Sequence, residues 1–173
     1  MWQVPTRIAL ATCEQLPDLD PDDQPLVNLF RKIGIEATPA VWSDSSIDWT
    51  LFDQIIIRNT WDYTNRLQEF LSWAKSNESR IRNSFETIQW NSNKIYLKEL
   101  ASVGFPIVDT QFVSGSYSAW DLPSASDFVV KPTVSAGSQD TMRFPASGPD
   151  SKHNAQNLIN RIVSQGKTAM VQP

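Results

Sequence analysis

The chain has 173 residues, 40% of them hydrophobic, which is enough to bury the core of one domain or of two small ones. Fifteen Lys and Arg against 19 Asp and Glu give a net charge of -4, which argues against a nucleic-acid partner held by bulk electrostatics. The single cysteine, Cys13, excludes an intrachain disulfide and, with His153 as the single histidine, a Cys/His metal cluster.

The first half of the chain alternates strand and helix patterns. Strands are expected at residues 7–12, 35–41 and 53–57, and helices at residues 26–33 and 67–75. This alternation predicts an α/β domain with a parallel, Rossmann-like sheet. Residues 80–91 look irregular, so we place a boundary there and expect domains at 1–88 and 89–173.

The second half has a different order of elements. Helices are expected at residues 94–102 and 154–164, and strands at 107–113, 128–131, 141–144 and 168–172. Residues 115–127 form a polar connection. This order predicts an antiparallel sheet carrying helices, an α+β arrangement distinct from the first half.

One lysine follows an apolar strand and precedes a loop of small residues. Lys131 comes directly after Phe128-Val129-Val130, and lysine is rarely buried without an anion nearby. Pro132 should end the strand, because proline cannot donate to the sheet. The next side chains are small enough to expose backbone N–H groups: Ser135, Ala136, Gly137 and Ser138. This pattern predicts a phosphate site; the alternative is a solvated hairpin loop.

A second lysine stands at the expected start of a helix. Lys94 follows Asn91-Ser92-Asn93, which are good capping residues. A positive charge at this end opposes the helix dipole by a few tenths of a kcal/mol, whereas a bound anion would reverse the sign. Lys94 is therefore a second candidate phosphate contact; the alternative is an exposed lysine that tolerates a small penalty.

The third strand is followed by Arg58-Asn59-Thr60-Trp61-Asp62-Tyr63. Open α/β sheets bind ligands at this end of their strands. Arg58 could hold a substrate carboxylate bidentately, and Trp61 and Tyr63 could wall the pocket around Asp62. The alternative is a turn capped by Asp62, with Arg58 in a local ion pair.

Other motifs carry less chemistry. The acidic residues Asp18, Asp20, Asp22 and Asp23 could bind a metal or could form a solvated loop that caps the next helix. The P-loop, the Gly-x-Gly-x-x-Gly fingerprint and the Gly-x-Ser-x-Gly elbow are absent. Tryptophans are predicted to serve packing: Trp2, Trp42, Trp49, Trp73 and Trp120. No stretch reaches membrane-spanning length, so we expect a cytoplasmic protein.

Taken together, these segments resemble the ATP-grasp superfamily, in particular its glutathione-synthetase-like and cycloserine-synthetase-like carboxylate–amine ligases. The resembling segments are Arg58-Asn59-Thr60-Trp61-Asp62-Tyr63, Trp90-Asn91-Ser92-Asn93-Lys94, Val129-Val130-Lys131-Pro132, Ser135-Ala136-Gly137 and Met170-Val171-Gln172-Pro173. The resemblance implies a Rossmann-like pre-ATP-grasp domain followed by the linking helix and lid subdomain. It also implies that Lys94 and Lys131 hold the phosphates of ATP, that Ser135 to Ser138 close over them, and that Gln172 lies beside the adenine.

The resemblance further implies Mg²⁺ as a cofactor and small-molecule carboxylate and amine substrates joined through an acyl phosphate. In that family the magnesium ligands follow the strand of Gln172, whereas this chain ends at Pro173. We therefore expect a truncated ligase that is inactive alone, with exposed apolar surface along residues 168–171. The alternative is a non-enzymatic nucleotide-binding or interaction module.

Overall fold

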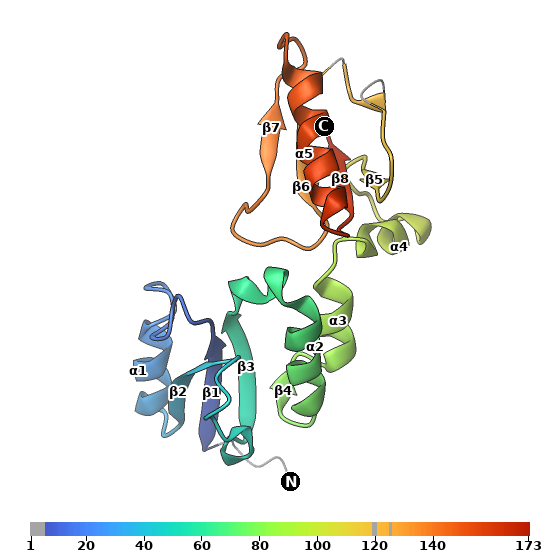
Figure 1. Ribbon diagram of the computed structural model, residues 1–173. Helices are drawn as coiled ribbons and strands as arrows, with labels where there is room; N and C mark the ends of the chain where they lie inside the picture. The colour runs from blue at the N-terminus through green and yellow to red at the C-terminus, as the bar shows by residue number, and fades with distance from the viewer. Residues whose placement is uncertain (1–5, 119–120, 125) are drawn as a thin grey trace. The chain divides into compact units, whose positions relative to one another are not determined.

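The computed structural model describes residues 6–118, 121–124 and 126–173 (Figure 1). The chain divides into two compact units, Met1–Trp90 and Asn91–Pro173. Each unit has its own sheet and its own hydrophobic core. The units are called unit 1 and unit 2 below.

Unit 1 contains a parallel four-stranded sheet in the order β2-β1-β3-β4 (Figure 1). Its strands are β1 (Arg7–Thr12), β2 (Glu36–Val41), β3 (Gln54–Asn59) and β4 (Ile81–Arg82). Its helices are α1 (Pro25–Lys32), α2 (Leu67–Ser76) and α3 (Phe85–Asn91), with 3-10 turns η1 (Trp49–Leu51) and η2 (Trp61–Asn65). Parallel neighbours need crossover connections, which the helices supply.

The two faces of this sheet bury different helices. Ile8 and Leu10 of β1 point to the face covered by α1, whereas Ala9 and Ala11 point to the face covered by α2 and α3. This division follows from the period of two along a strand. Full burial of a side chain such as Leu10 is worth about 1.5–3 kcal/mol. The predicted Rossmann-like parallel sheet is therefore confirmed.

Unit 2 contains an antiparallel four-stranded sheet in the order β5-β8-β6-β7. Its strands are β5 (Gln111–Val113), β6 (Phe128–Pro132), β7 (Met142–Phe144) and β8 (Ala169–Gln172). Its helices are α4 (Tyr96–Ser102) and α5 (Ser151–Ser164). Helix α5 packs on one face of the sheet, with Leu158, Ile159 and Ile162 against Val130 and Val171. The predicted antiparallel sheet carrying helices is also confirmed.

Four local predictions are wrong. Residues 80–91 are not irregular, because they form β4 and α3. Helix α4 begins at Tyr96, so Lys94 lies in the turn before it, where its carbonyl oxygen accepts the Leu97 N–H. Strand β5 has only three residues rather than seven. Residues 169–171 are buried, because β8 lies between β5 and β6.

The tryptophan prediction holds where it can be checked. Trp42, Trp49 and Trp73 pack together with Phe70 in the core between the sheet and α2. The Trp42 and Phe70 rings meet edge to face, with centroids 5.3 Å apart, a favourable arrangement of ring quadrupoles. Trp2 and Trp120 lie outside the described residues.

Candidate functional site

The face of the unit 2 sheet that is turned away from α5 brings several predicted residues together. Lys131 on β6 pairs with Met170 on β8, and Val129 pairs with Gln172. Residues directly opposite in an antiparallel sheet share a face, as do residues two apart on one strand. Lys131 and Gln172 therefore lie on one face, while Val130 and Val171 point to the core under α5.

Lys94 is attached to the segment that follows β6. Its backbone N–H donates to the carbonyl oxygen of Thr133 at 2.9 Å. Its Nζ donates to the Ser135 carbonyl oxygen at 2.8 Å and contacts Ser135 Oγ at 3.0 Å. Ser135 Oγ also lies 3.1 Å from the Pro132 carbonyl oxygen. The Lys94 ammonium thus contacts oxygens of the small-residue loop.

Burial lowers the pKa of Lys94, and the positive charge of Lys131 lowers it further. The two cations are therefore close enough to repel one another. Within the described residues, neither lysine forms an ion pair with a carboxylate, and no hydrogen bond of the Lys131 ammonium is found. Two neighbouring cations without a carboxylate form a site that favours an external anion.

The loop between β6 and β7 has an unusual backbone. Gly137 and Ser138 both have positive φ, at 58° and 59°, and Asp140 follows at 51°. Glycine tolerates this conformation without strain, whereas an L side chain in it is uncommon. The loop's last turn is attached to α5, because Arg161 Nη2 donates to Asp140 Oδ1 at 2.9 Å. Gly137 and Ser138 themselves are exposed, and Ala136 is half-buried.

Gln172 is held from the segment that precedes β5. Its Nε2 donates to Thr110 Oγ1 at 2.7 Å, a contact between residues 62 apart in sequence. Phe112 shares this face of the sheet, because it pairs with Met170. The Lys98 ammonium of α4 lies 4.7 Å from the centroid of the Phe112 ring. Nothing in the sequence pattern singled out Thr110, since its role depends on which strand lies beside β5.

In unit 1, the polar side chains at the carboxyl end of β3 are paired with side chains from other segments of the unit. Arg58 forms an ion pair with Asp23, and its Nε lies 3.1 Å from Asp23 Oδ2. The buried Asn59 donates its side-chain amide to the same carboxylate at 2.9 Å. The ion pair is thus not local, as its partners are 35 residues apart. The Arg58 guanidinium, with help from Asn59, holds the pKa of the Asp23 carboxyl below its usual range.

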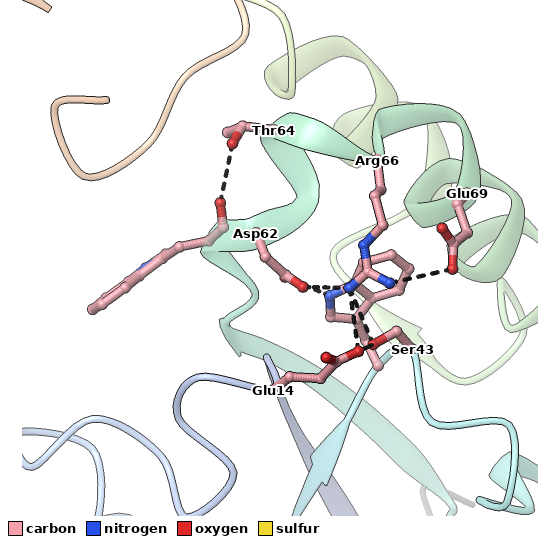
Figure 2. A network of polar contacts seen from close by, with 8 residues as sticks. Glu14, Ser43, Asp62, Thr64, Arg66 and Glu69 are labelled. Atoms are coloured by element: carbon pink, nitrogen blue, oxygen red, sulfur yellow. Dashed lines mark hydrogen bonds and ion pairs between the residues drawn. The ribbon is translucent and has the colours of Figure 1, made fainter. Parts of the chain in front are cut away.

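Figure 2 shows a second polar network, around Arg66, at the same end of the sheet. Asp62 accepts a hydrogen bond from Trp42 Nε1 at 2.7 Å and another from Arg66 Nη2. Glu14 lies 3.7 Å from the Arg66 guanidinium, which also stacks 4.7 Å from the centroid of the Trp42 ring. Asp62 therefore ties the segment after β3 to the core; it does not cap η2, whose N-cap is Thr60. Arg66 carries no motif, so sequence reasoning missed it.

The two aromatic residues of this segment differ in exposure. Trp61 is 47% exposed, whereas Tyr63 is half-buried with its ring 5.2 Å from that of Phe70. Only Trp61 of the pair presents a large free surface.

The acidic run before α1 is not a solvated loop that caps the helix. Its last residue, Asp23, forms an ion pair with Arg58, and α1 has no side-chain cap.

Two negative findings apply to the residues described by the structure. Among them, no group of three or more His, Cys, Asp or Glu side chains could hold a metal ion. In the same residues, no helix combines the length and apolarity needed to cross a bilayer. The acidic run Asp18 to Asp23 is thus not a metal site in this structure.

Comparisons with known proteins agree with this architecture. Residues 8–83 match the family described as "D-cycloserine synthetase DcsG, N-terminal domain". The chain is 31% identical to the cycloserine biosynthesis protein DcsG of Streptomyces lavendulae, over 96% of this chain and 58% of that protein. The crystal structure of D-cycloserine synthetase DcsG superposes with a TM-score of 0.83 at 29% identity, again over 96% of this chain and 59% of the other.

More distant structures share the fold alone. A RimK domain ATP-grasp protein from Sphaerobacter thermophilus gives a TM-score of 0.63 at 16% identity, covering 96% of this chain and 63% of that one. The D-alanine-D-alanine ligase of Helicobacter pylori gives 0.60 at 11% identity, covering 97% and 66%. Over the part compared, the chain has the α/β fold of ATP-grasp proteins. The chain is similar in sequence to DcsG over this part, and it spans about 58% of that relative's length.

Proposed function

We propose that this chain binds ATP on the face of unit 2 that carries Lys131 and Gln172. The protein would use the nucleotide as an ATP-grasp ligase does: a substrate carboxylate oxygen attacks the γ-phosphorus, ADP leaves, and an amine displaces phosphate from the acyl phosphate. Because the chain covers 58% of DcsG, this reaction is proposed for the whole protein, and nucleotide binding for the part in hand. We assign residues 1–88 to the pre-ATP-grasp domain and residues 89–173 to the linking helix and lid.

The observation that carries this proposal is the pair of lysines without carboxylate partners. Lys131 lies on the face of the sheet turned away from α5, and Lys94 lies near enough for its pKa to respond to Lys131. Phosphoryl transfer needs cations and amides positioned around developing charge more than it needs a covalent catalyst. A triphosphate would neutralise both cations, and the lysines would orient its phosphates.

The small-residue loop is proposed to close over the phosphates. Ser135 already contacts the Lys94 ammonium through two oxygens, so the loop begins beside the proposed phosphate position. Ala136, Gly137 and Ser138 carry little bulk, and the positive φ angles of Gly137 and Ser138 turn the backbone sharply. Successive N–H groups in such turns form concave anion sites.

Magnesium is proposed to bind together with the nucleotide. ATP-grasp ligases use Mg²⁺, which binds phosphate oxygens together with one or two carboxylates. The described residues offer no cluster of metal-binding side chains, so no step is assigned here to a protein-bound magnesium ion. The ion would arrive with the nucleotide.

The substrate side is proposed at the carboxyl ends of the unit 1 strands, near Arg58, Trp61, Asp62 and Tyr63. Parallel α/β sheets bind ligands at this edge. Trp61 offers the free surface there, being 47% exposed. Asp62 and Tyr63 would hold this segment in position, Asp62 through its hydrogen bonds with Trp42 and Arg66 and Tyr63 through its contact with Phe70. Arg58 could still contact a carboxylate, as its side chain is 40% exposed beside Asp23.

A thermal-shift measurement with Mg-ATP tests the proposal. At ten times Kd, nucleotide should stabilise the chain by about 1.4 kcal/mol and raise Tm by about 3–6 °C. Lys131→Ala should remove the shift, because it deletes a cation of the proposed phosphate site. Lys152→Ala, on α5 and thus on the covered side of the sheet, is the matched control and should keep the shift. Equal Tm values with and without millimolar Mg-ATP would contradict the proposal.

A further inference from the structure

We propose that Thr110 fixes the orientation of the Gln172 side-chain amide and so makes the site selective for a purine that carries an amino group at C6. This inference rests on the proposed function, since it requires the base of the nucleotide to lie at β8. It assigns a positioning role to a residue that precedes β5 and would not itself touch the nucleotide.

The hydrogen bonds around Thr110 have a fixed direction. Its Oγ1 donates to the carbonyl oxygen of Val108 at 2.7 Å. A carbonyl oxygen can only accept, so the single hydroxyl proton is engaged there. Thr110 Oγ1 is then left with acceptor capacity alone, and it meets Gln172 Nε2 at 2.7 Å. The donor end of the Gln172 amide must therefore face Thr110.

The opposite orientation is disfavoured by the same geometry. If the amide rotated by half a turn, its Oε1 would face Thr110 Oγ1 at about the same distance with no proton between the two oxygens. The hydroxyl would have to leave Val108 to repair this. As the amide stands, Oε1 points away from Thr110, and it accepts no hydrogen bond from any residue within the described ranges.

A carbonyl oxygen in this position discriminates between purines. Adenine presents an amino donor at C6, whereas guanine and hypoxanthine present an oxygen acceptor there. Gln172 Oε1 can accept from the amino group but would oppose the oxygen. A polar group placed to bond one substrate group rejects analogues that leave it unpaired.

The position of Gln172 suits a nucleotide whose phosphates lie at the lysines. Gln172 is two residues along β8 from Met170, the partner of Lys131, which corresponds to about 7 Å of strand. The side chains of Lys131 and Gln172 lie on the same face of the sheet, turned away from α5. A base at Gln172 therefore leaves its phosphates on the side of Lys131 and Lys94.

The test compares the dissociation constants of Mg-ATP and Mg-ITP by calorimetry on the full chain. Thr110→Val keeps the shape of the side chain but removes both the acceptor and the donor. The freed amide can then turn its N–H toward the C6 oxygen of ITP, so the ratio of the two constants should fall about tenfold. Folding should be little affected, because Val108, whose carbonyl loses its donor, is 55% exposed and water can replace the hydroxyl.

Three further variants test whether the change in the ratio depends on the Thr110 hydroxyl and the Gln172 amide. Thr110→Ser retains the hydroxyl and should retain the preference for ATP. The double variant Thr110→Val with Gln172→Glu should recover the preference, because a carboxylate offers only acceptors in either orientation. Thr38→Val, an exposed threonine on β2 of unit 1, is the matched control and should leave the ratio unchanged.

The outcomes separate the two proposals. A wild-type chain that binds ATP selectively, together with a Thr110→Val ratio within about twofold of it, would overturn the role of Thr110 and leave ATP binding in place. The same change of ratio in Thr38→Val would also overturn it. A wild-type chain that binds neither nucleotide would overturn the proposed function, and the inference with it.

Discussion

Units 1 and 2 differ in how their charged side chains are paired. At the carboxyl end of the unit 1 sheet, Arg58 pairs with Asp23 and Arg66 pairs with Asp62. In unit 2, neither Lys94 nor Lys131 forms an ion pair with a carboxylate within the described residues. Charges that satisfy one another stabilise a fold, whereas like charges held together need a ligand to relieve them. The polar edge of unit 1 therefore has charges that are paired with one another, whereas unit 2 has two cations that a bound anion would neutralise.

The largest expected effect is on the stability of unit 1. Arg58→Ala leaves the Asp23 carboxylate, whose side chain is only 11% exposed, with Asn59 as its remaining side-chain partner. Because the guanidinium itself is 40% exposed, we expect a loss of about 2 kcal/mol rather than the 3–5 kcal/mol typical of fully buried pairs. Urea denaturation followed by tryptophan fluorescence measures it, since every tryptophan but Trp120 lies in unit 1.

Arg31→Ala is the control for this experiment. Arg31 is exposed on α1, and its guanidinium bonds only Asn28 within the described residues. Its loss should change the free energy of unfolding by less than about 0.5 kcal/mol. If Arg58→Ala were equally mild, the pairing at this edge would not be structural, and Arg58 would become a stronger candidate for a ligand contact.

The long aliphatic strands of unit 1 could be predicted from the sequence, whereas its short elements could not. The long strands were readable because β1 and β3 are runs of aliphatic residues that must be buried on both faces. Strand β4 was missed because it has two residues, too few to show a period. Helix α3 was missed because its seven residues include only one that is buried, Ile88.

For the candidate site, the sequence predicted which residue types take part but not which side chains they contact. Lys94 and Lys131 were paired through a family resemblance, since a spacing of 37 residues contains no geometric information of its own. The partner of Arg58 depends on the path of the loop before α1, which brings Asp23 to β3. Thr110 reaches Gln172 only because β5 and β8 are neighbours. Such contacts follow from tertiary structure, so they had to be observed.

An intermediate effect is expected on nucleotide affinity at alkaline pH. The pKa of Lys94 is lowered in the free protein, whereas a bound phosphate would favour the charged amine. Affinity for Mg-ATP should therefore be full below this lowered pKa and should fall as the pH rises through it, by about tenfold for each unit by which binding raises the pKa. Calorimetric titrations from neutral pH upward measure this decline.

Lys94→Met supplies the comparison for the alkaline experiment. This variant should bind Mg-ATP more weakly at neutral pH and should lack the part of the decline that belongs to Lys94. Lys152→Met, on the covered side of the sheet, should reproduce the wild-type profile. A flat wild-type profile would mean that Lys94 does not meet the phosphates, and that its contact with Ser135 is structural.

The smallest expected effect concerns the network around Arg66. Asp62→Asn keeps an oxygen for Trp42 Nε1 but removes the negative charge that faces the guanidinium. Because Arg66 also contacts Glu14 and Glu69 and stacks on Trp42, we expect a loss of about 1 kcal/mol. Glu69→Gln, at a more exposed partner, should cost less than about 0.5 kcal/mol. Both values come from urea denaturation with tryptophan fluorescence, and nucleotide affinity should stay unchanged in both variants. A variant that left stability intact but weakened Mg-ATP binding would mean that Asp62 acts on the nucleotide site, and the contrast between the paired charges of unit 1 and the cations of unit 2 would then fail at this residue.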